Sequence, residues 1–348
     1  MSEISIYTVT PRQAKSLVID AIESGLVPNL HSSPGMGKSS IMREVAKHFN
    51  LHLIDHRMST SVPEDLTGLP RFNDRNRAEF VPFEDLFPIQ GDTIPTGKDG
   101  WMIFLDEFPA ALKQVQAASF KLILDKMVGQ KYLHENVVIS AAGNLMSDRS
   151  IVNPISTAMQ SRMVHLEMRV DFTEWLEDVA LKQGYDTRII AFLSQYNGKL
   201  MDFRPDHTEK TFCCPRTWEF MQKLLKGGRP VNAERTALFA GTITSGVAAE
   251  FVQFCRVYTD MIRLDQVLSS PGTAPLPPST DLKWATVTML ADKADAQNLD
   301  KLSDYIERFS VDFKILFYRM VFHNPALKLR EHPVFRKAMI EMNKYLKY

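Results

Sequence analysis

Lys38 and Ser39 follow two closely spaced glycines in residues 31–39, which read HSSPGMGKS. Glycines let backbone N–H groups turn toward an anion, and a helix that starts there adds the positive end of its dipole. A lysine at this position reaches the β- and γ-phosphates of a nucleotide, and the next hydroxyl ligates Mg²⁺. The segment predicts a phosphate-binding loop, rather than an ordinary glycine-rich turn, although the strict pattern has glycine at Ser32. The residues expected to contact nucleotide are Pro34, Gly35, Met36, Gly37, Lys38, Ser39 and Ser40.

Asp106 and Glu107 end an apolar run, residues 102–105 (MIFL). Such a run predicts a central strand beneath the phosphates, with its acidic end facing the metal. We expect Asp106 to hold Mg²⁺, usually through water, and Glu107 to orient and deprotonate the attacking water. An acidic strand end is common by itself, but together with the phosphate loop it favours hydrolysis over simple nucleotide binding.

Asn144 ends a third apolar segment, residues 137–143 (VVISAAG). The carboxyl ends of strands in a doubly wound sheet gather around the ligand crevice, so this amide is expected to reach the γ-phosphate or the attacking water. The alternative is a turn-forming asparagine after Gly143. Because it is the third polar residue in succession at a strand end, the catalytic interpretation is favoured.

The elements that position these residues alternate between strands and helices. Apolar runs predict strands over 27–30, 51–54, 101–105, 137–142 and 164–168, and helical periodicity covers 11–26, 38–49 and 113–127. Alternation of this kind predicts an α/β fold with a mainly parallel five-stranded sheet. We expect an α/β core over residues 1–170 with an insert at about 63–98, an α-helical lid over 171–258 and a helical C-terminal extension over 259–348. A proline-rich linker is expected at 269–281.

The bulk composition excludes several classes of protein. Lys+Arg and Asp+Glu are equal at 41 each, so no global field steers the chain onto nucleic acid or an acidic membrane. No apolar run approaches the ~18 residues of a membrane span, and the first residues do not resemble a secretory signal. Only Cys213, Cys214 and Cys255 are present, without metal-ligand spacing, which favours buried thiols in a reducing compartment. These features predict a cytoplasmic protein that does not contact membranes.

Several motifs together resemble the AAA+ superfamily, and more narrowly its MoxR-like branch in the helix-2-insert clade. The resemblance covers most of the chain. Besides the phosphate loop and the acidic strand, it rests on Arg57 and on the segments 63–70, 80–82, 116–118, 122–124, 142–144, 158–162 and 215–219. It implies a P-loop AAA+ core that hydrolyses ATP with Mg²⁺ and assembles into a homo-hexameric ring.

The resemblance also implies roles for arginines. Arg162 resembles the arginine finger that reaches into the neighbouring subunit's site, and Arg216 resembles sensor 2, a lid arginine that contacts the γ-phosphate. With Glu107 and Asn144, they complete the expected catalytic set. Arg149 is a further candidate for a contact between subunits. The alternative for Arg162 and Arg216 is a surface salt bridge.

Three functions follow for such a protein. The first is a remodelling chaperone that acts on a protein client, often paired in this branch with a protein carrying a von Willebrand factor A domain. The second is a nucleic-acid motor or nucleotide-driven restriction-type subunit, which the neutral charge and the lack of a known nucleic-acid motif do not indicate. The third is an ATP-dependent scaffold. Four phenylalanines of the insert, Phe72, Phe80, Phe83 and Phe87, either grip a partner or pack the insert on the core.

Overall fold

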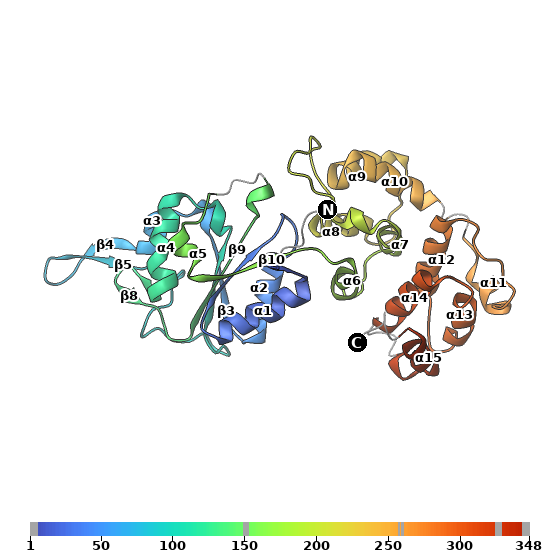
Figure 1. The fold of residues 1–348 in the computed structure, drawn as a ribbon, viewed down its shortest axis with the longest axis horizontal. Coiled ribbons are helices and arrows are strands. Elements are labelled where there is room, and N and C mark those ends of the chain that lie inside the picture. Colours follow the sequence, from blue (N-terminus) through green and yellow to red (C-terminus); the bar gives the residue numbers. More distant parts are fainter. Residues whose placement is uncertain (1–5, 149–152, 257, 259–260, 324–328, 343–348) are drawn as a thin grey trace. The chain divides into compact units, whose positions relative to one another are not determined.

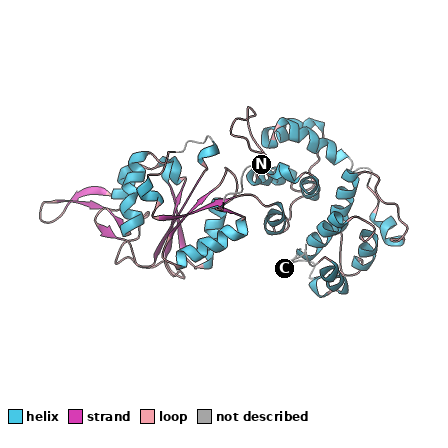
Figure 2. Ribbon diagram, in the orientation of Figure 1, coloured by secondary structure: helices cyan, strands magenta, loops and turns pink. Residues whose placement is uncertain are grey.

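The computed structural model describes residues 6–148, 153–256, 258, 261–323 and 329–342. The chain divides into two compact units. Unit 1 comprises residues 1–170 and 204–207, and unit 2 comprises 171–203 and 208–348. Unit 1 contains the sheet, whereas unit 2 is mainly helical (Figures 1 and 2).

Unit 1 is built on a six-stranded parallel sheet with the order β1-β10-β2-β9-β6-β3. The strands are β1 (Thr8–Val9), β2 (Val27–His31), β3 (His52–Arg57), β6 (Trp101–Asp106), β9 (Val137–Gly143) and β10 (Met163–Met168). The expected α/β fold with a parallel sheet is confirmed, but the sheet has six strands rather than five. The additional strand, β1, has only two residues, too few for an apolar pattern to reveal it.

Helices cover both faces of the sheet (Figure 2), so the central strand β6 is buried along its whole length. They are α1 (Pro11–Glu23), α2 (Lys38–His48), α3 (Pro63–Thr67), α4 (Lys113–Asp125) and α5 (Thr157–Gln160). Alternate residues of a strand point to opposite faces. Ile103 and Leu105 of β6 therefore pack with Val115 and Leu122 of α4 in one apolar cluster. Burial on both faces explains why these strands read as continuous apolar runs.

The insert forms an antiparallel hairpin that projects from the sheet (Figure 1). Its strands are β4 (Leu69–Phe72) and β5 (Ala78–Val81), and a smaller hairpin joins β7 (Met127–Val128) to β8 (Lys131–Tyr132). The phenylalanines of the insert differ in burial. Phe87 is buried in the core of unit 1, whereas Phe72 is 73% exposed and Phe80 is 44% exposed.

Unit 2 begins with the predicted helix cap at Asp171, whose side chain accepts a hydrogen bond from the Glu174 backbone N–H at 2.8 Å. The following helices are α6 (Phe172–Trp175), a π-helical turn (Leu176–Ala180), α7 (Thr187–Gln195), α8 (Pro215–Leu225), α9 (Thr236–Ile243), α10 (Ser245–Arg256), α11 (Leu264–Ser269), α12 (Thr280–Asp292), α13 (Leu299–Ile306), α14 (Val311–His323) and α15 (Pro333–Glu341). Phe192, Trp218 and Phe251 form the aromatic centre of the first helices. Helix α12 packs on both α7 and α14, so the expected lid and extension share one compact unit.

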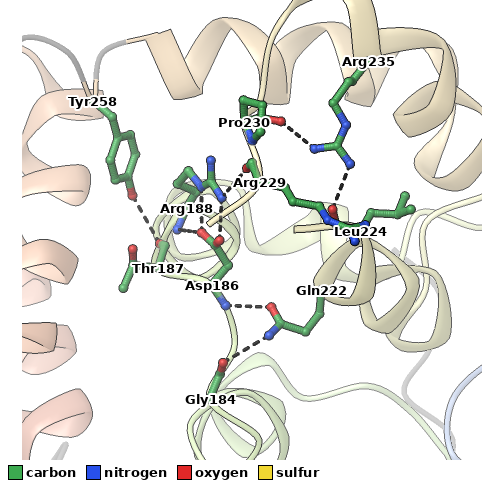
Figure 3. A network of polar contacts seen from close by, with 10 residues as sticks. All are labelled: Gly184, Asp186, Thr187, Arg188, Gln222, Leu224, Arg229, Pro230, Arg235 and Tyr258. Atoms are coloured by element: carbon green, nitrogen blue, oxygen red, sulfur yellow. Dashed lines mark hydrogen bonds and ion pairs between the residues drawn. The ribbon is translucent and has the colours of Figure 1, made fainter. Parts of the chain in front are cut away.

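A polar network fixes helix α8, which carries Arg216 near its first turn (Figure 3). Gln222 accepts a hydrogen bond from the Asp186 backbone N–H and donates one to the Gly184 carbonyl, at 2.7 and 3.1 Å. Arg188 pairs with Asp186 at 2.6 Å and donates to the Arg229 carbonyl at 3.0 Å. These bonds anchor the end of α8 and the loop after it to the start of α7.

The proline-rich segment between α11 and α12 has no regular structure but is tied to α13. Tyr305 Oη donates to the Pro275 carbonyl at 2.8 Å, and Arg308 donates to the Ala274 carbonyl at 2.6 Å. Ala274 is buried. Side chains from α13 and from the residues just after it therefore satisfy backbone oxygens of this segment. In the described part of the chain, no helix has the length and apolar character needed to cross a membrane.

Candidate nucleotide site

The predicted phosphate loop lies between β2 and α2, at the carboxyl edge of the sheet. Gly35 and Gly37 have φ angles of 75° and 89°, in the left-handed region that favours glycine. Gly37 is the N-cap of α2, and the Ser40 N–H bonds its carbonyl at 2.9 Å. The loop therefore directs its backbone toward the start of a helix, where an anion is stabilised.

Lys38 joins the beginning of this loop to the end of β9. Its Nζ donates to the Ser32 carbonyl at 2.9 Å and the Ser32 Oγ at 3.1 Å. The same ammonium donates to Asn144 Oδ1 at 2.9 Å. Ser32 occupies the position where the strict loop pattern has glycine, and its hydroxyl accepts a hydrogen bond from the lysine. Serine at this position therefore adds a hydrogen bond that glycine, without a side chain, could not make.

Ser39 and Asp106 also meet at this edge. Ser39 Oγ donates to Asp106 Oδ2 at 3.0 Å, and the Asp106 side chain is 6% exposed. Asp106 is the last residue of β6, in register with Arg57 at the end of β3. Three segments separated in sequence, the phosphate loop, the end of β6 and the end of β9, therefore share one hydrogen-bonded cluster.

Glu107 follows Asp106 in a left-handed backbone conformation, with φ 57°. Such a conformation is costly for a residue with a side chain and is found most often at functional positions. The Ser59 hydroxyl donates a hydrogen bond to Glu107 Oε2. Arg57 NH1 lies 3.9 Å from the other carboxylate oxygen. The segment after β3 therefore holds the carboxylate from one side.

Gly143 allows β9 to approach the turn that follows Glu107. A Cβ at Gly143 would lie 2.0 Å from Pro109 Cδ and 2.5 Å from its Cγ. Because this contact is with a proline ring, neither partner can move away cheaply. The missing side chain at Gly143 thus sets the distance between the strand that ends in Asn144 and the turn that carries Glu107.

A pair of histidines links β2 to β10 beside the loop. His31 Nε2 and His165 Nδ1 are 3.0 Å apart, and His165 Nε2 lies 3.0 Å from the Gln160 carbonyl. Since a carbonyl only accepts, His165 Nε2 carries the proton and His31 donates to Nδ1. Burial, followed by the charges of His165 and Lys38, lowers the pKa of His31 to about 4. His31 is neutral at physiological pH.

The predicted arginines lie elsewhere. Arg162 precedes Met163, which pairs with Val27 at the start of β2. The phosphate loop follows the other end of β2, four residues or roughly 13 Å along the strand. Arg162 is exposed and donates to the Ala158 carbonyl in the preceding helix α5. Arg216 belongs to unit 2, where it is exposed in the first turn of α8. Arg149 lies outside the described residues.

Sequence patterns did not identify every residue of the cluster. Ser59 contacts Glu107, but an isolated serine in a loop gives no sequence signal for such a contact. Only the family resemblance indicates Arg57. For Ser32, the departure from the loop pattern is itself a signal, because a hydroxyl at this position can accept a hydrogen bond from the lysine.

Comparisons with known proteins do not assign a family. No protein-family model matches the chain. A curated formamidopyrimidine-DNA glycosylase of Mycoplasma mobile is 28% identical over 134 residues, which is 37% of this chain and 45% of that protein. The match thus spans less than half the length of that relative.

Two solved structures share a distant likeness with the chain. One is a presumed ATPase from Cytophaga hutchinsonii, with 14% identity, a TM-score of 0.36, and coverage of 96% of this chain and 88% of that chain. The other is a RuvB mutant from Thermotoga maritima, also with 14% identity and a TM-score of 0.36, covering 75% of this chain and 74% of that chain. The function is therefore inferred from the geometry of the site.

Proposed function

We propose that this chain binds and hydrolyses ATP, as a MoxR-like AAA+ ATPase. The observation that supports this most directly is the shared cluster at the carboxyl edge of the sheet. Lys38 Nζ lies 2.9 Å from Asn144 Oδ1, and Ser39 Oγ lies 3.0 Å from Asp106 Oδ2. An ammonium, a hydroxyl, a carboxylate and an amide beside a glycine-rich loop suit a triphosphate and its metal. Adenine recognition leaves no motif, so the choice of ATP over GTP rests on the family resemblance.

The residues fit Mg²⁺ at this position. Magnesium is usually held by one or two protein oxygens together with phosphates and water, rather than by a cage of side chains. Ser39 and Asp106 supply such oxygens, and no cluster of three or more His, Cys, Asp or Glu suited to a metal occurs among the described residues. Burial, and next the charge of Asp106, raises the pKa of the neighbouring Asp55.

The chain's own groups account for the remaining steps of hydrolysis. The loop N–H groups and Lys38 hold the phosphates, and bound Mg²⁺ would neutralise charge on the β- and γ-phosphates. Glu107 accepts a proton from water as the water oxygen attacks the γ-phosphorus. The bond to the bridging oxygen then breaks, leaving ADP and phosphate. Asn144 orients the water or the γ-phosphate. The Ser59 hydroxyl, which donates a hydrogen bond to Glu107 Oε2, helps to orient this carboxylate.

Binding of an ATP analogue to the Lys38→Ala variant tests the proposal. Lost hydrogen bonds between the ammonium and the phosphates should weaken binding of mant-ATP by about tenfold to a hundredfold. Lys47→Ala, on the same helix at an exposed position, is the matched control and should bind normally. Equal affinity of the Lys38→Ala variant and the wild-type protein would contradict the assignment of the phosphate loop.

The proposal includes assembly into a ring, with Arg162 entering the site of the neighbouring protomer. Its exposure at the amino edge of the sheet supports a role outside its own site. Light scattering during gel filtration of the Glu107→Gln variant with MgATP should detect a hexamer. A monomer at all nucleotide and protein concentrations would contradict the ring.

The projecting β4–β5 hairpin, with Phe72 and Phe80 exposed, supports action on a protein client. A partner with a von Willebrand factor A domain is proposed from the family resemblance alone. The competing function is a DNA-directed motor, to which the partial similarity with a DNA glycosylase gives some weight. ATPase assays with single- and double-stranded DNA over a salt series decide between them, because strong salt-sensitive stimulation favours the motor. Turnover that disappears in Glu107→Gln excludes a scaffold that does not hydrolyse ATP.

A further inference from the structure

The histidine pair beside the phosphate loop extends to the short helix that precedes Arg162. His31 Nε2 lies 3.0 Å from His165 Nδ1, and His165 Nε2 lies 3.0 Å from the Gln160 carbonyl. His31 is the last residue of β2 and the first of the loop motif, whereas Gln160 is the last residue of α5. Two hydrogen bonds in series therefore join the start of the phosphate loop to the segment that carries the proposed finger.

The bond to Gln160 completes the carboxyl end of α5. The last carbonyls of a helix have no partner within it and need one from elsewhere. Three of the four carbonyls of α5 accept hydrogen bonds from the two residues that follow the helix, and they are those of Thr157, Ala158 and Met159. The fourth, that of Gln160, accepts from His165 Nε2. His165 therefore caps the helix two residues before Arg162.

This cap depends on which nitrogen of His165 carries the proton. A neutral imidazole has a single N–H, and the hydrogen bond made at one nitrogen determines which of the two carries it. His31 makes that bond, because its Nε2–H donates to His165 Nδ1. Without this donor the proton is free to move to Nδ1, and a lone pair on Nε2 would then face the Gln160 carbonyl oxygen. His31 thus fixes the tautomer that caps α5.

Helix α5 has only four residues, so few contacts determine its direction. Met159, at 1% exposure, anchors it in the apolar cluster of unit 1. The Ser156 hydroxyl accepts from the Met159 N–H at 3.3 Å and caps the start of the helix. The bond from His165 holds the other end, directly before the exposed Arg162. The direction of the guanidinium therefore depends on a contact made by a neighbouring strand.

We propose that His165 is a positioning residue for Arg162, and that His31 acts through His165 by fixing its tautomer. This inference rests on the proposed function, in which Arg162 enters the site of the neighbouring protomer. The finger that a chain offers to its neighbour is then tied to the loop that holds its own nucleotide. A misplaced catalytic group lowers turnover, whereas ground-state binding of the substrate changes little.

Two amides at position 165 separate the two ends of the imidazole. In His165→Gln the side-chain amide reaches the place of Nε2 and can donate to Gln160, whereas the shorter amide of His165→Asn reaches only the place of Nδ1. Turnover of ATP should fall about tenfold in His165→Asn with little change in mant-ATP affinity, and should stay within about twofold of wild type in His165→Gln. His52→Asn, at an exposed position at the start of β3, is the matched control and should be fully active.

Mixed assemblies identify the side of the shared site that is affected. A His165→Asn chain keeps its own Glu107, so a Glu107→Gln neighbour with a correctly held Arg162 should raise turnover per His165→Asn chain severalfold. Mixing with Arg162→Ala should give no such rise, because neither chain then offers a correctly held finger. Damage to the fold would lower turnover and nucleotide affinity together, and would not depend on the choice of partner.

Equal turnover in His165→Asn and His165→Gln, or an equal rise with both partners, would overturn the role of His165. If thermal unfolding shows that His165→Asn does not fold, His31→Asn repeats the test, because it keeps His165 and removes only its donor. It should show the same loss of turnover and the same dependence on partner. Failure of the proposed function is separate, because Arg162→Ala would then hydrolyse ATP normally whatever residue stands at position 165.

Discussion

The two edges of the parallel sheet differ in how their functional side chains are held. At the carboxyl edge, Lys38, Asp106 and Asn144 come from three segments and take part in bonds that cross between segments. At the amino edge, Arg162 is exposed, and its described hydrogen bonds go to the preceding helix α5. In parallel α/β sheets the ligand crevice lies outside the carboxyl ends of the strands, so convergence of polar side chains at that edge is expected.

This difference suggests a division of the active site between protomers. In the proposed site, the carboxyl edge supplies the groups that would bind a nucleotide and activate water within one chain. The amino edge presents a guanidinium that lies roughly 13 Å along β2 from its own loop. If a second chain places its amino edge against the first chain's carboxyl edge, the site gains a cation for the transition state. Nucleotide binding and turnover should therefore respond differently to changes at the two edges.

The largest effect is expected at the amino edge. Arg162→Ala should reduce ATP turnover by about a thousandfold or more while changing nucleotide affinity little, since a finger acts on charge that develops in the transition state. Steady-state hydrolysis and mant-ATP binding measure the two quantities. Arg169→Ala, directly after β10, removes an exposed arginine paired with Glu167 and serves as the control. Parallel losses of binding and turnover would instead indicate a role in folding or assembly.

The carboxyl edge should show a comparable loss of turnover when Glu107 is replaced. Glu107→Gln removes the base but keeps its shape, so hydrolysis should fall by about a hundredfold to ten-thousandfold and binding should persist. Mixing the Glu107→Gln and Arg162→Ala proteins sharpens the comparison. A ring that contains both has interfaces with an intact base and an intact finger, so activity should partly return. Mixtures as inactive as their components would argue against a site shared between chains.

The same contrast explains what could be predicted from the sequence. The carboxyl-edge cluster depends on spacing within local motifs and on apolar strands, both of which are visible in one dimension. The strands ending at Asp106 and Gly143 were therefore located together with their polar residues. The sequence does not predict β1, because two residues are too few to show the alternating pattern of a strand.

Other features depend on contacts that no local pattern encodes. Ser59 reaches Glu107 across 48 residues of sequence, and its partner is set by how β3 and β6 align. The burial of Phe87 and the exposure of Phe72 likewise follow from the path of the insert, since both residues are equally apolar.

A steric change should perturb the carboxyl edge to a smaller extent. Gly143→Ala places a methyl group 2.0 Å from Pro109 Cδ, so the strand end or the turn must shift. Overpacking of this kind typically costs about 1–3 kcal/mol, and the shift should also lower turnover by displacing Asn144 from Lys38. Urea unfolding and ATPase assays measure both effects. Gly198→Ala, whose added Cβ would meet nothing within 4 Å, is the matched control. Unchanged stability would mean that the contact relaxes without cost.

A final effect, absent at neutral pH, concerns the histidine pair, which connects the loop at one edge to the segment before Arg162 at the other. The pKa of His31 is lowered from 6.5 to about 4 in the folded protein, mainly by burial. As pH falls below 6.5 the unfolded chain takes up a proton that the folded chain refuses, so the free energy of unfolding decreases until about pH 4.

The full loss is roughly 3 kcal/mol. Urea unfolding of wild-type protein and His31→Gln between pH 7 and pH 4 isolates this contribution, because glutamine does not titrate while the other acid-sensitive groups remain in both proteins. The difference in stability between the two should shrink, or shift in favour of His31→Gln, as pH falls. Parallel pH profiles would show that the folded protein accepts the proton, which would contradict the lowered pKa of His31.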